Sequence, residues 1–261
     1  DSILENKTNI IYFHLPVSIE ERFKFGIRFI TSAYAILLPD DEFYVPTALA
    51  SCVTFLKENK DFVSCKGQTI YFDYQKNKIL AKEHYEGLLS YQVSENEPHL
   101  RMNKHMSDYE MVSLYSVIKS DAFKKTLQTI SYYSNFKSAV IAEIQTSLIV
   151  SFLGKCATIK ELMWFRSGEN DNIWWTQAPQ SFLEWFKDEN NKKEIEIFFK
   201  SILSSLDLKF NKENKKPFEI ALNKFIDDAN QKIYEKNLKQ KTYSNRSKLF
   251  IKKILKLLFF N

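Results

Sequence analysis

The residues best suited to chemistry are three adjacent acids, Asp40, Asp41 and Glu42, which follow a short apolar run and precede Phe43. Adjacent carboxylates repel one another, and a shared cation relieves that repulsion. Hard oxygen ligands suit Mg²⁺ or Mn²⁺, which commonly bridge one or two carboxylates to substrate phosphates. The alternative is a solvated acidic turn that caps the next helix, which composition alone favours because acid strings are common.

The position of these acids in the chain changes that balance. The apolar run 35–38 predicts a strand that Pro39 ends, and Thr47 begins a predicted helix that Asn59 closes. In open α/β sheets, ligands bind beyond the carboxyl ends of the strands. We therefore expect the acidic run to lie at a ligand-binding edge of a sheet.

Strand and helix patterns alternate through the first 70 residues, which predicts a parallel α/β core. Strands are expected at 9–14, 35–38, 62–65, 69–72, 113–118 and 157–165. Helices are expected at 18–31, 47–59, 121–133, 138–152, 182–206, 218–233 and 244–258. The polar stretch 74–110 is expected to be mobile or inserted. The predicted fold is an α/β domain over 1–170, with a mixed sheet flanked by helices, followed by an all-helical C-terminal region over 171–261.

Charge is unevenly distributed along the chain. The net charge is +5, but the segment from Lys236 to the end carries eight Lys/Arg and no acid, leaving about −3 for the rest. A generally basic surface is therefore absent, which argues against nucleic-acid binding. The predicted last helix, 244–258, is basic and amphipathic and is a candidate for binding an anionic membrane surface. Packing on its own domain or on a neighbouring domain is the alternative.

Cysteine usage and hydropathy bear on the compartment. Cys52, Cys65 and Cys156 are far apart, odd in number and without zinc-site spacing, so we expect buried free thiols and a reducing environment. The sequence has no run of 18 uncharged apolar residues and no signal peptide. These features predict a cytoplasmic protein that binds, if at all, at the inner face of the membrane.

The acidic run belongs to a longer pattern, Ala-Ile-Leu-Leu-Pro-Asp-Asp-Glu-Phe-Tyr-Val-Pro-Thr-Ala-Leu, over residues 35–49. It resembles a family of bacterial GT-A-type (family 2-like) glycosyltransferases, which carry an apolar strand, an Asp-Asp-Asp-Phe run and a Val-Pro-x-x-Leu helix start. The similarity continues through 55–62, Gly67, 114–121 and Glu143, and it covers roughly residues 1–170. The first string is fairly specific, and the later blocks are weaker.

The resemblance implies a metal-dependent, inverting glycosyltransferase of bacterial surface polysaccharide or glycoconjugate assembly. Asp40 would contact the nucleotide ribose or base, and Asp41 and Glu42 would approach a Mn²⁺ or Mg²⁺ ion and the diphosphate. Glu143 would deprotonate the acceptor hydroxyl. The implied partners are a nucleotide-sugar donor and a glycan or lipid-linked acceptor. Arg166 is a candidate for binding the diphosphate bidentately, with a structural ion pair as the alternative.

Two departures from the family pattern motivate a second hypothesis. Glu42 replaces the third aspartate of the usual run, and Asp1-Ser2 stands where the family's nucleobase-binding strand and loop would end. The chain would then be a catalytically inactive, glycosyltransferase-like scaffold or acceptor-binding module of a larger polypeptide.

The remaining candidates have plainer alternatives. His105 could contact phosphate or acceptor, but a surface histidine is the simpler interpretation, and His14 is expected to be structural. The tryptophans are candidates for stacking on a sugar, with packing in a core or domain seam as the default; they are Trp164, Trp174, Trp175 and Trp185.

Overall fold

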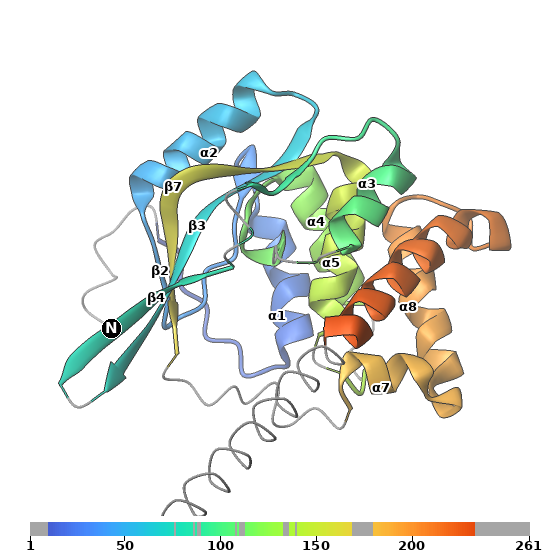
Figure 1. Ribbon diagram of the computed structural model, residues 1–261. Coiled ribbons are helices and arrows are strands. Elements are labelled where there is room, and N and C mark those ends of the chain that lie inside the picture. Colours follow the sequence, from blue (N-terminus) through green and yellow to red (C-terminus); the bar gives the residue numbers. More distant parts are fainter. Residues whose placement is uncertain are drawn as a thin grey trace, which may run out of the picture.

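The computed structural model describes residues 10–75, 77–85, 87, 90–107, 109, 113–132, 136–138, 140–168 and 180–232. It has an α/β architecture in which helices flank one mixed, curved sheet (Figure 1). The strands are β1 (Tyr34–Ala35), β2 (Phe43–Tyr44), β3 (Phe62–Gln75), β4 (Lys78–His84), β5 (Gln92–Val93), β6 (Val117–Lys119) and β7 (Lys155–Ser167). The predicted α/β class with a mixed sheet and C-terminal helices is confirmed.

Most helices follow the predicted pattern, but the helix at 98–106 was not predicted and the predicted helix 182–206 is interrupted at 188–191. They are α1 (Ile19–Gly26), α2 (Pro46–Glu58), α3 (Pro98–Met106), α4 (Ser120–Ile130), α5 (Ile141–Leu153), α7 (Phe182–Lys187) and α8 (Lys192–Ser205). Short 3-10 turns are η1 (Ile27–Phe29), η3 (Ser113–Tyr115) and η4 (Glu189–Asn191), and residues 212–232 are also helical. The predicted stop signals hold, because Asn59 caps α2 and Gly154 caps α5.

The prediction of a parallel core is wrong for the described strands. The sheet runs β1-β6-β3-β7-β2, with β4 on β3 and β5 on β7, and only the β3–β7 pair is parallel. The prediction failed because hydrophobic runs bounded by helices suggested repeated strand–helix–strand crossover connections, which join parallel strands. The chain instead makes a long β3–β4 hairpin, which projects from the body of the molecule (Figure 1).

Two further sequence expectations also fail. Residues 10–14 form no strand, and Ile11 and Tyr12 are 69% and 68% exposed. The stretch 74–110 was expected to be mobile or inserted. Its described residues contribute β4, β5 and α3, and Met102 and Met106 of α3 are fully buried. The polar residues of that stretch concealed this pattern, because few apolar positions anchor each element.

The central β3–β7 pair is irregular where the candidate site lies. Its register shifts between Lys66 and Gln68 and again before Thr69, which marks β-bulges. A Cβ on Gly67 would stand 2.5 Å from both Glu161 O and Met163 Cβ. Only glycine fits this approach, so the resemblance block that includes Gly67 has a packing reason. Bulges of this kind re-aim side chains next to functional sites.

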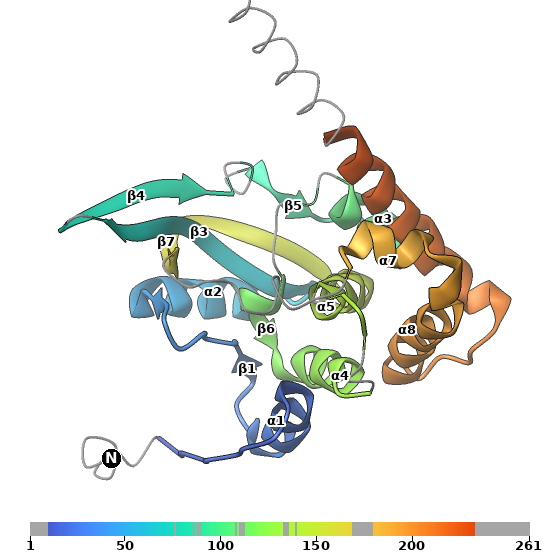
Figure 2. The ribbon, with the colours of Figure 1, turned by 90° about the horizontal axis from the view of Figure 1, so that it is seen from below.

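The C-terminal helices share a hydrophobic core with α3 and α5 and lie beside α4 and α5 (Figures 1 and 2). Buried side chains of this core include Ile144, Phe198 and Leu222. Gln145 Nε2 of α5 donates to Ser201 Oγ of α8 at 2.9 Å. The helical region therefore supports α5, the helix that carries Glu143.

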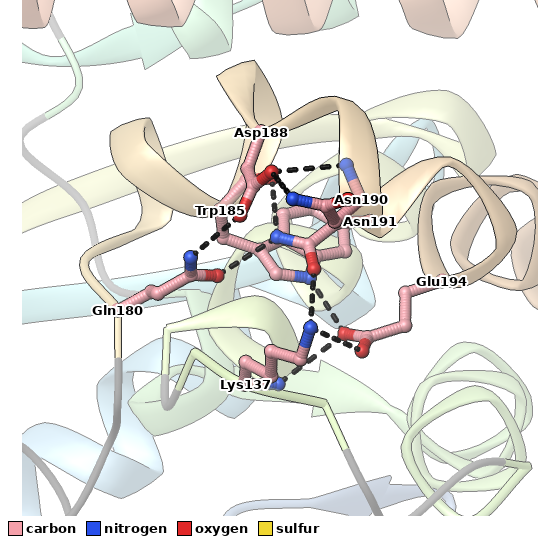
Figure 3. A network of polar contacts seen from close by, with 7 residues as sticks. All are labelled: Lys137, Gln180, Trp185, Asp188, Asn190, Asn191 and Glu194. Carbon is pink, nitrogen blue, oxygen red and sulfur yellow. Dashed lines mark hydrogen bonds and ion pairs between the residues drawn. The ribbon is translucent and has the colours of Figure 1, made fainter.

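A polar network fixes the chain just before α5 (Figure 3). Lys137 Nζ donates to Asn191 Oδ1 at 2.7 Å, and the same ammonium lies 3.7 Å from Glu194 Oε1. Trp185 Nε1 donates to Glu194 Oε2 at 2.8 Å. The fully buried Asn191 also donates to Gln180 Oε1 and to the carbonyl of Trp185. This network sets the position from which α5 begins.

Candidate functional site

Strand pairing brings the acidic run to Arg166. In the antiparallel β2–β7 pair, Phe43 stands opposite Phe165 and Tyr44 opposite Trp164, so continuing the register sets Glu42 opposite Arg166. Arg166 Nε lies 3.9 Å from Glu42 Oε1, and Trp164 Nε1 donates to Glu42 Oε2 at 2.5 Å. The Glu42 side chain is only 9% exposed.

Lys66 is the unexpected member of this cluster. Its side chain is fully buried, and its Nζ has no hydrogen-bond partner among the described residues. The ammonium lies 4.4 Å from the centre of the Trp164 ring and 4.8 Å from that of Tyr85. Arg166 Cζ approaches the same tryptophan at 5.5 Å. Two cations therefore converge on one indole.

Aromatic rings enclose these charges. Tyr115 and Tyr85 stack on Trp164 with ring-centre distances of 4.9 and 6.4 Å. Trp164 has no exposed surface, so it belongs to the core, as the default interpretation predicted. Tyr44 Oη donates to the carbonyls of Leu37 and Tyr115. These contacts hold the chain before and after the acidic run.

Tyr85 and His84 close the cluster on the side of β4. Arg166 Nη1 donates to Tyr85 Oη at 2.5 Å and lies 3.3 Å from His84 Nε2. Tyr85 has a φ of 62°, a conformation that a bulky residue adopts at a cost of order 1–3 kcal/mol. Such strain persists where surrounding contacts fix it, here through the Arg166 bond.

Glu143 enters from the first turn of α5. It is half-buried, and its charge acts on Lys66, Tyr85 and Tyr115. Burial raises the pKa of Glu143, and the charges of Arg166 and Lys66 oppose that rise. A carboxylate with a raised pKa is a stronger base once deprotonated, which suits the predicted role.

Burial disfavours charge throughout the cluster. It raises the pKa of Glu42 to about 7, against the opposing hydrogen bond from Trp164 and the charge of Arg166. It lowers the pKa of Lys66 to about 7, and Arg166 lowers it further, while Glu143 and Glu42 oppose the change. The pKa of His84 falls to about 4, chiefly through burial and then through Arg166. Titratable groups shifted in opposite directions are typical of functional sites.

The structure thus places Glu42 beside Arg166, and the charge of Arg166 also acts on Glu143, although the three residues come from segments far apart in sequence. Asp41 is half-buried next to them, and its charge contributes to the raised pKa of Glu42. Asp40 is exposed, and no described contact joins it to the cluster. In the part of the chain that the structure describes, no group of three His, Cys, Asp or Glu side chains is arranged to hold a metal.

The carboxylates of the acidic run decide whether the expected Mn²⁺ or Mg²⁺ could be held there. Such a cation shared with a substrate diphosphate requires only one or two protein carboxylates. Both Glu42 oxygens already face Trp164 and Arg166, as described above. Asp41, which is half-buried in the same acidic run, is the other carboxylate that could approach such a cation.

Other sequence candidates lie elsewhere. His105 is not on the surface: it is fully buried in α3, between Tyr91 Oη and Ser113 Oγ. His14 is exposed. Trp185 packs in the core beside Phe182 and Phe198. Trp174 and Trp175 lie outside the described residues, as does the predicted helix 244–258.

The three cysteines are buried free thiols, as predicted.

A surface hollow of about 540 Å³ is lined by Gln180, Glu184, Lys187 and Asp188. The two carboxylates there cap α7 and η4. Their capping role explains them without a ligand. Over the described residues, no helix has the length and apolar character that crossing a membrane requires.

Comparison of the sequence with protein-family models gives no match, and comparison with curated proteins gives no significant match. The functional argument therefore rests on the cluster itself.

Sequence reasoning missed Lys66, His84, Tyr85 and Tyr115. One signal was present for Lys66: a charged residue directly follows the apolar strand run at 62–65 and precedes Gly67. Nothing in the pattern of 74–110 indicated that His84 and Tyr85 face the same point.

Proposed function

We propose that the protein is an inverting glycosyltransferase that moves a sugar from a nucleoside diphosphate donor to a hydroxyl acceptor. The observation that carries this proposal is the convergence of Glu42 and Arg166 on the buried Trp164 indole, with the charges of Arg166 and Lys66 acting on Glu143. The acidic run and Glu143 were singled out by the resemblance, and Arg166 by its residue type. Their spatial convergence is independent support for one site.

In the proposed reaction Glu143 accepts the proton of the acceptor hydroxyl. The hydroxyl oxygen attacks the anomeric carbon as the bond to the diphosphate breaks, and the diphosphate leaves with the electron pair. Arg166 meets the charge that develops on the leaving group. A Mn²⁺ or Mg²⁺ held through Asp41 would add Lewis-acid stabilisation of that charge. Before the donor binds, Glu42 lies beside Arg166 and accepts the Trp164 hydrogen bond.

The donor claim is tested by thermal unfolding of the full chain with a panel of nucleoside diphosphates plus Mn²⁺. A binding nucleotide raises Tm by mass action, because it binds the folded state alone. The Asp41→Ala variant is expected to lose that rise. If no member of the panel shifts the Tm of the wild-type chain, the donor site is refuted.

Catalysis is tested separately with Glu143→Gln. Loss of a general base typically costs 10²–10⁴ in rate, whereas binding of the nucleoside diphosphate should persist. A wild-type chain that binds nucleotide but neither transfers nor hydrolyses the sugar would favour the scaffold hypothesis.

We place the pathway in bacterial surface polysaccharide or glycoconjugate assembly, with a glycan or lipid-linked acceptor at the cytoplasmic face of the membrane.

A further inference from the structure

Lys66 carries a charge that the fold itself does not require. Its side chain is fully buried and its Nζ lacks an acceptor within the described residues. A buried ion without adequate partners costs several kcal/mol, and apolar residues of similar volume are often more stable in such places. The two aromatic rings near Lys66 offset part of that cost through cation–π attraction.

The second cation makes the arrangement still less favourable without a ligand. Arg166 lies over the same Trp164 ring as Lys66, and its charge disfavours the Lys66 ammonium. The guanidinium of Arg166 stays protonated in proteins, so at least one positive charge is present at the centre of the cluster, over the same indole as the buried Lys66 Nζ.

The ion pair between Arg166 and Glu42 is loose. Arg166 Nε and Glu42 Oε1 are 3.9 Å apart, beyond hydrogen-bond distance. The Arg166 side chain is 26% exposed, so an anion arriving from solvent meets it before Lys66. Arginine can bind two phosphate oxygens at once, and lysine adds a compact point charge.

We propose that Lys66 and Arg166 together form a site for the diphosphate of the sugar donor, an inference that rests on the proposed glycosyltransferase function. The incoming diphosphate takes the place of Glu42 beside Arg166, while Glu42 keeps its bond to Trp164. Lys66, which is buried more deeply than Arg166, neutralises the charge of the leaving group from the inner side. The bulge around Gly67 aims Lys66 at this point.

The test is isothermal titration of the full chain with inorganic pyrophosphate and, separately, with a panel of nucleoside diphosphates. Both titrations are made in EDTA and then in Mn²⁺. The variant is Lys66→Met, because an unbranched apolar chain fills the same space. The matched control is Lys82→Met, which also removes a lysine set over a tyrosine, with Nζ 5.3 Å from the Tyr71 ring, but on the exposed strand β4.

We expect Lys66→Met to weaken both pyrophosphate and nucleoside diphosphate at least tenfold in EDTA, and Lys82→Met to change them less than threefold. A Tm of Lys66→Met at or above that of the wild type shows that the loss is not unfolding. Equal nucleotide affinity in Lys66→Met and wild type would overturn the inference and leave the glycosyltransferase proposal standing.

A different result would support the anion site at Lys66 and Arg166 but refute the nucleotide-sugar donor. If pyrophosphate binding depends on Lys66 but no nucleoside diphosphate binds more tightly than pyrophosphate, the anion site stands and the nucleotide donor is refuted. If the wild-type chain binds neither probe in either condition, both claims are refuted.

Discussion

Replacing Lys66 with methionine should stabilise the protein near neutral pH, in contrast to most substitutions of fully buried residues. The change removes a buried, unpartnered ammonium and leaves a chain of similar length that packs against Trp164 and Tyr85. Exchanges of buried ion pairs for apolar residues of similar volume are often neutral or stabilising by about 1–4 kcal/mol. For a chain of this size, each kcal/mol raises Tm by roughly 2–4 °C.

The stability difference between Lys66→Met and the wild type should depend on pH. The pKa of Lys66 is 10.5 in the unfolded chain and about 7 in the folded protein. Below pH 7 both states are protonated, and the full cost of burying the charge is present. Between about pH 7 and 10.5 the unfolded state binds more protons, so wild-type stability rises with pH through this group, by at most about 1.4 kcal/mol per unit. The advantage of Lys66→Met should therefore be largest near pH 6.5 and small near pH 10.

Urea unfolding of wild type and Lys66→Met at pH 6.5 and 9.5 measures this difference. The groups facing Lys66 are Glu42, Tyr85, Glu143 and Arg166, and the two acids also titrate. Repeating the comparison in a Glu143→Gln background removes one of these acids. The reasoning is refuted if Lys66→Met is less stable than wild type at pH 6.5, or if the gap between them is the same at both pH values.

Further substitutions test the frame around the cluster. Gly67→Ala should lower the free energy of unfolding by about 1–3 kcal/mol, because the added Cβ would lie 2.5 Å from Glu161 O and Met163 Cβ. The control Gly26→Ala, in open space at the end of α1, should be neutral or stabilise the protein by up to about 1 kcal/mol. Urea midpoints of the two variants measure this difference, and equal effects would contradict the close approach at Gly67. Asn191→Ala should lower the free energy of unfolding by about 1–3 kcal/mol, because it leaves buried partners of the network unpaired. The same change at the exposed Asn190 should lower it by less than about 0.5 kcal/mol. A larger loss for Asn190→Ala than for Asn191→Ala in calorimetric unfolding would contradict the structural role of Asn191.

Much of the fold could be predicted from local chemistry. The helix from Pro46 to Glu58 has proline at its first position and a clear apolar face, and the helix before Gly154 has a clear stop signal. Pairing direction could not be predicted, because apolar runs such as 62–65 and 69–72 fit either parallel or antiparallel neighbours. These two runs are in fact one long strand that passes through Gly67.

The candidate site could be predicted only in part. The resemblance pointed to Glu42 and Glu143, and residue type pointed to Arg166, whereas the environment of a lysine cannot be predicted from spacing. Lys66 is unusual only because long-range pairing of β3 with β7 buries it under Trp164 and Tyr85. His105 was misplaced for the same reason, since its burial depends on Tyr91 and Ser113 from separate segments.

The most direct test of the central claim is a crystal structure of the full chain soaked with a nucleoside diphosphate and Mn²⁺. The account predicts the diphosphate at the Arg166 guanidinium and the Lys66 ammonium, with charge-assisted distances of about 2.7–2.9 Å and the Arg166–Glu42 contact broken. Diphosphate bound elsewhere on the chain, with Glu42 still paired to Arg166, would contradict it.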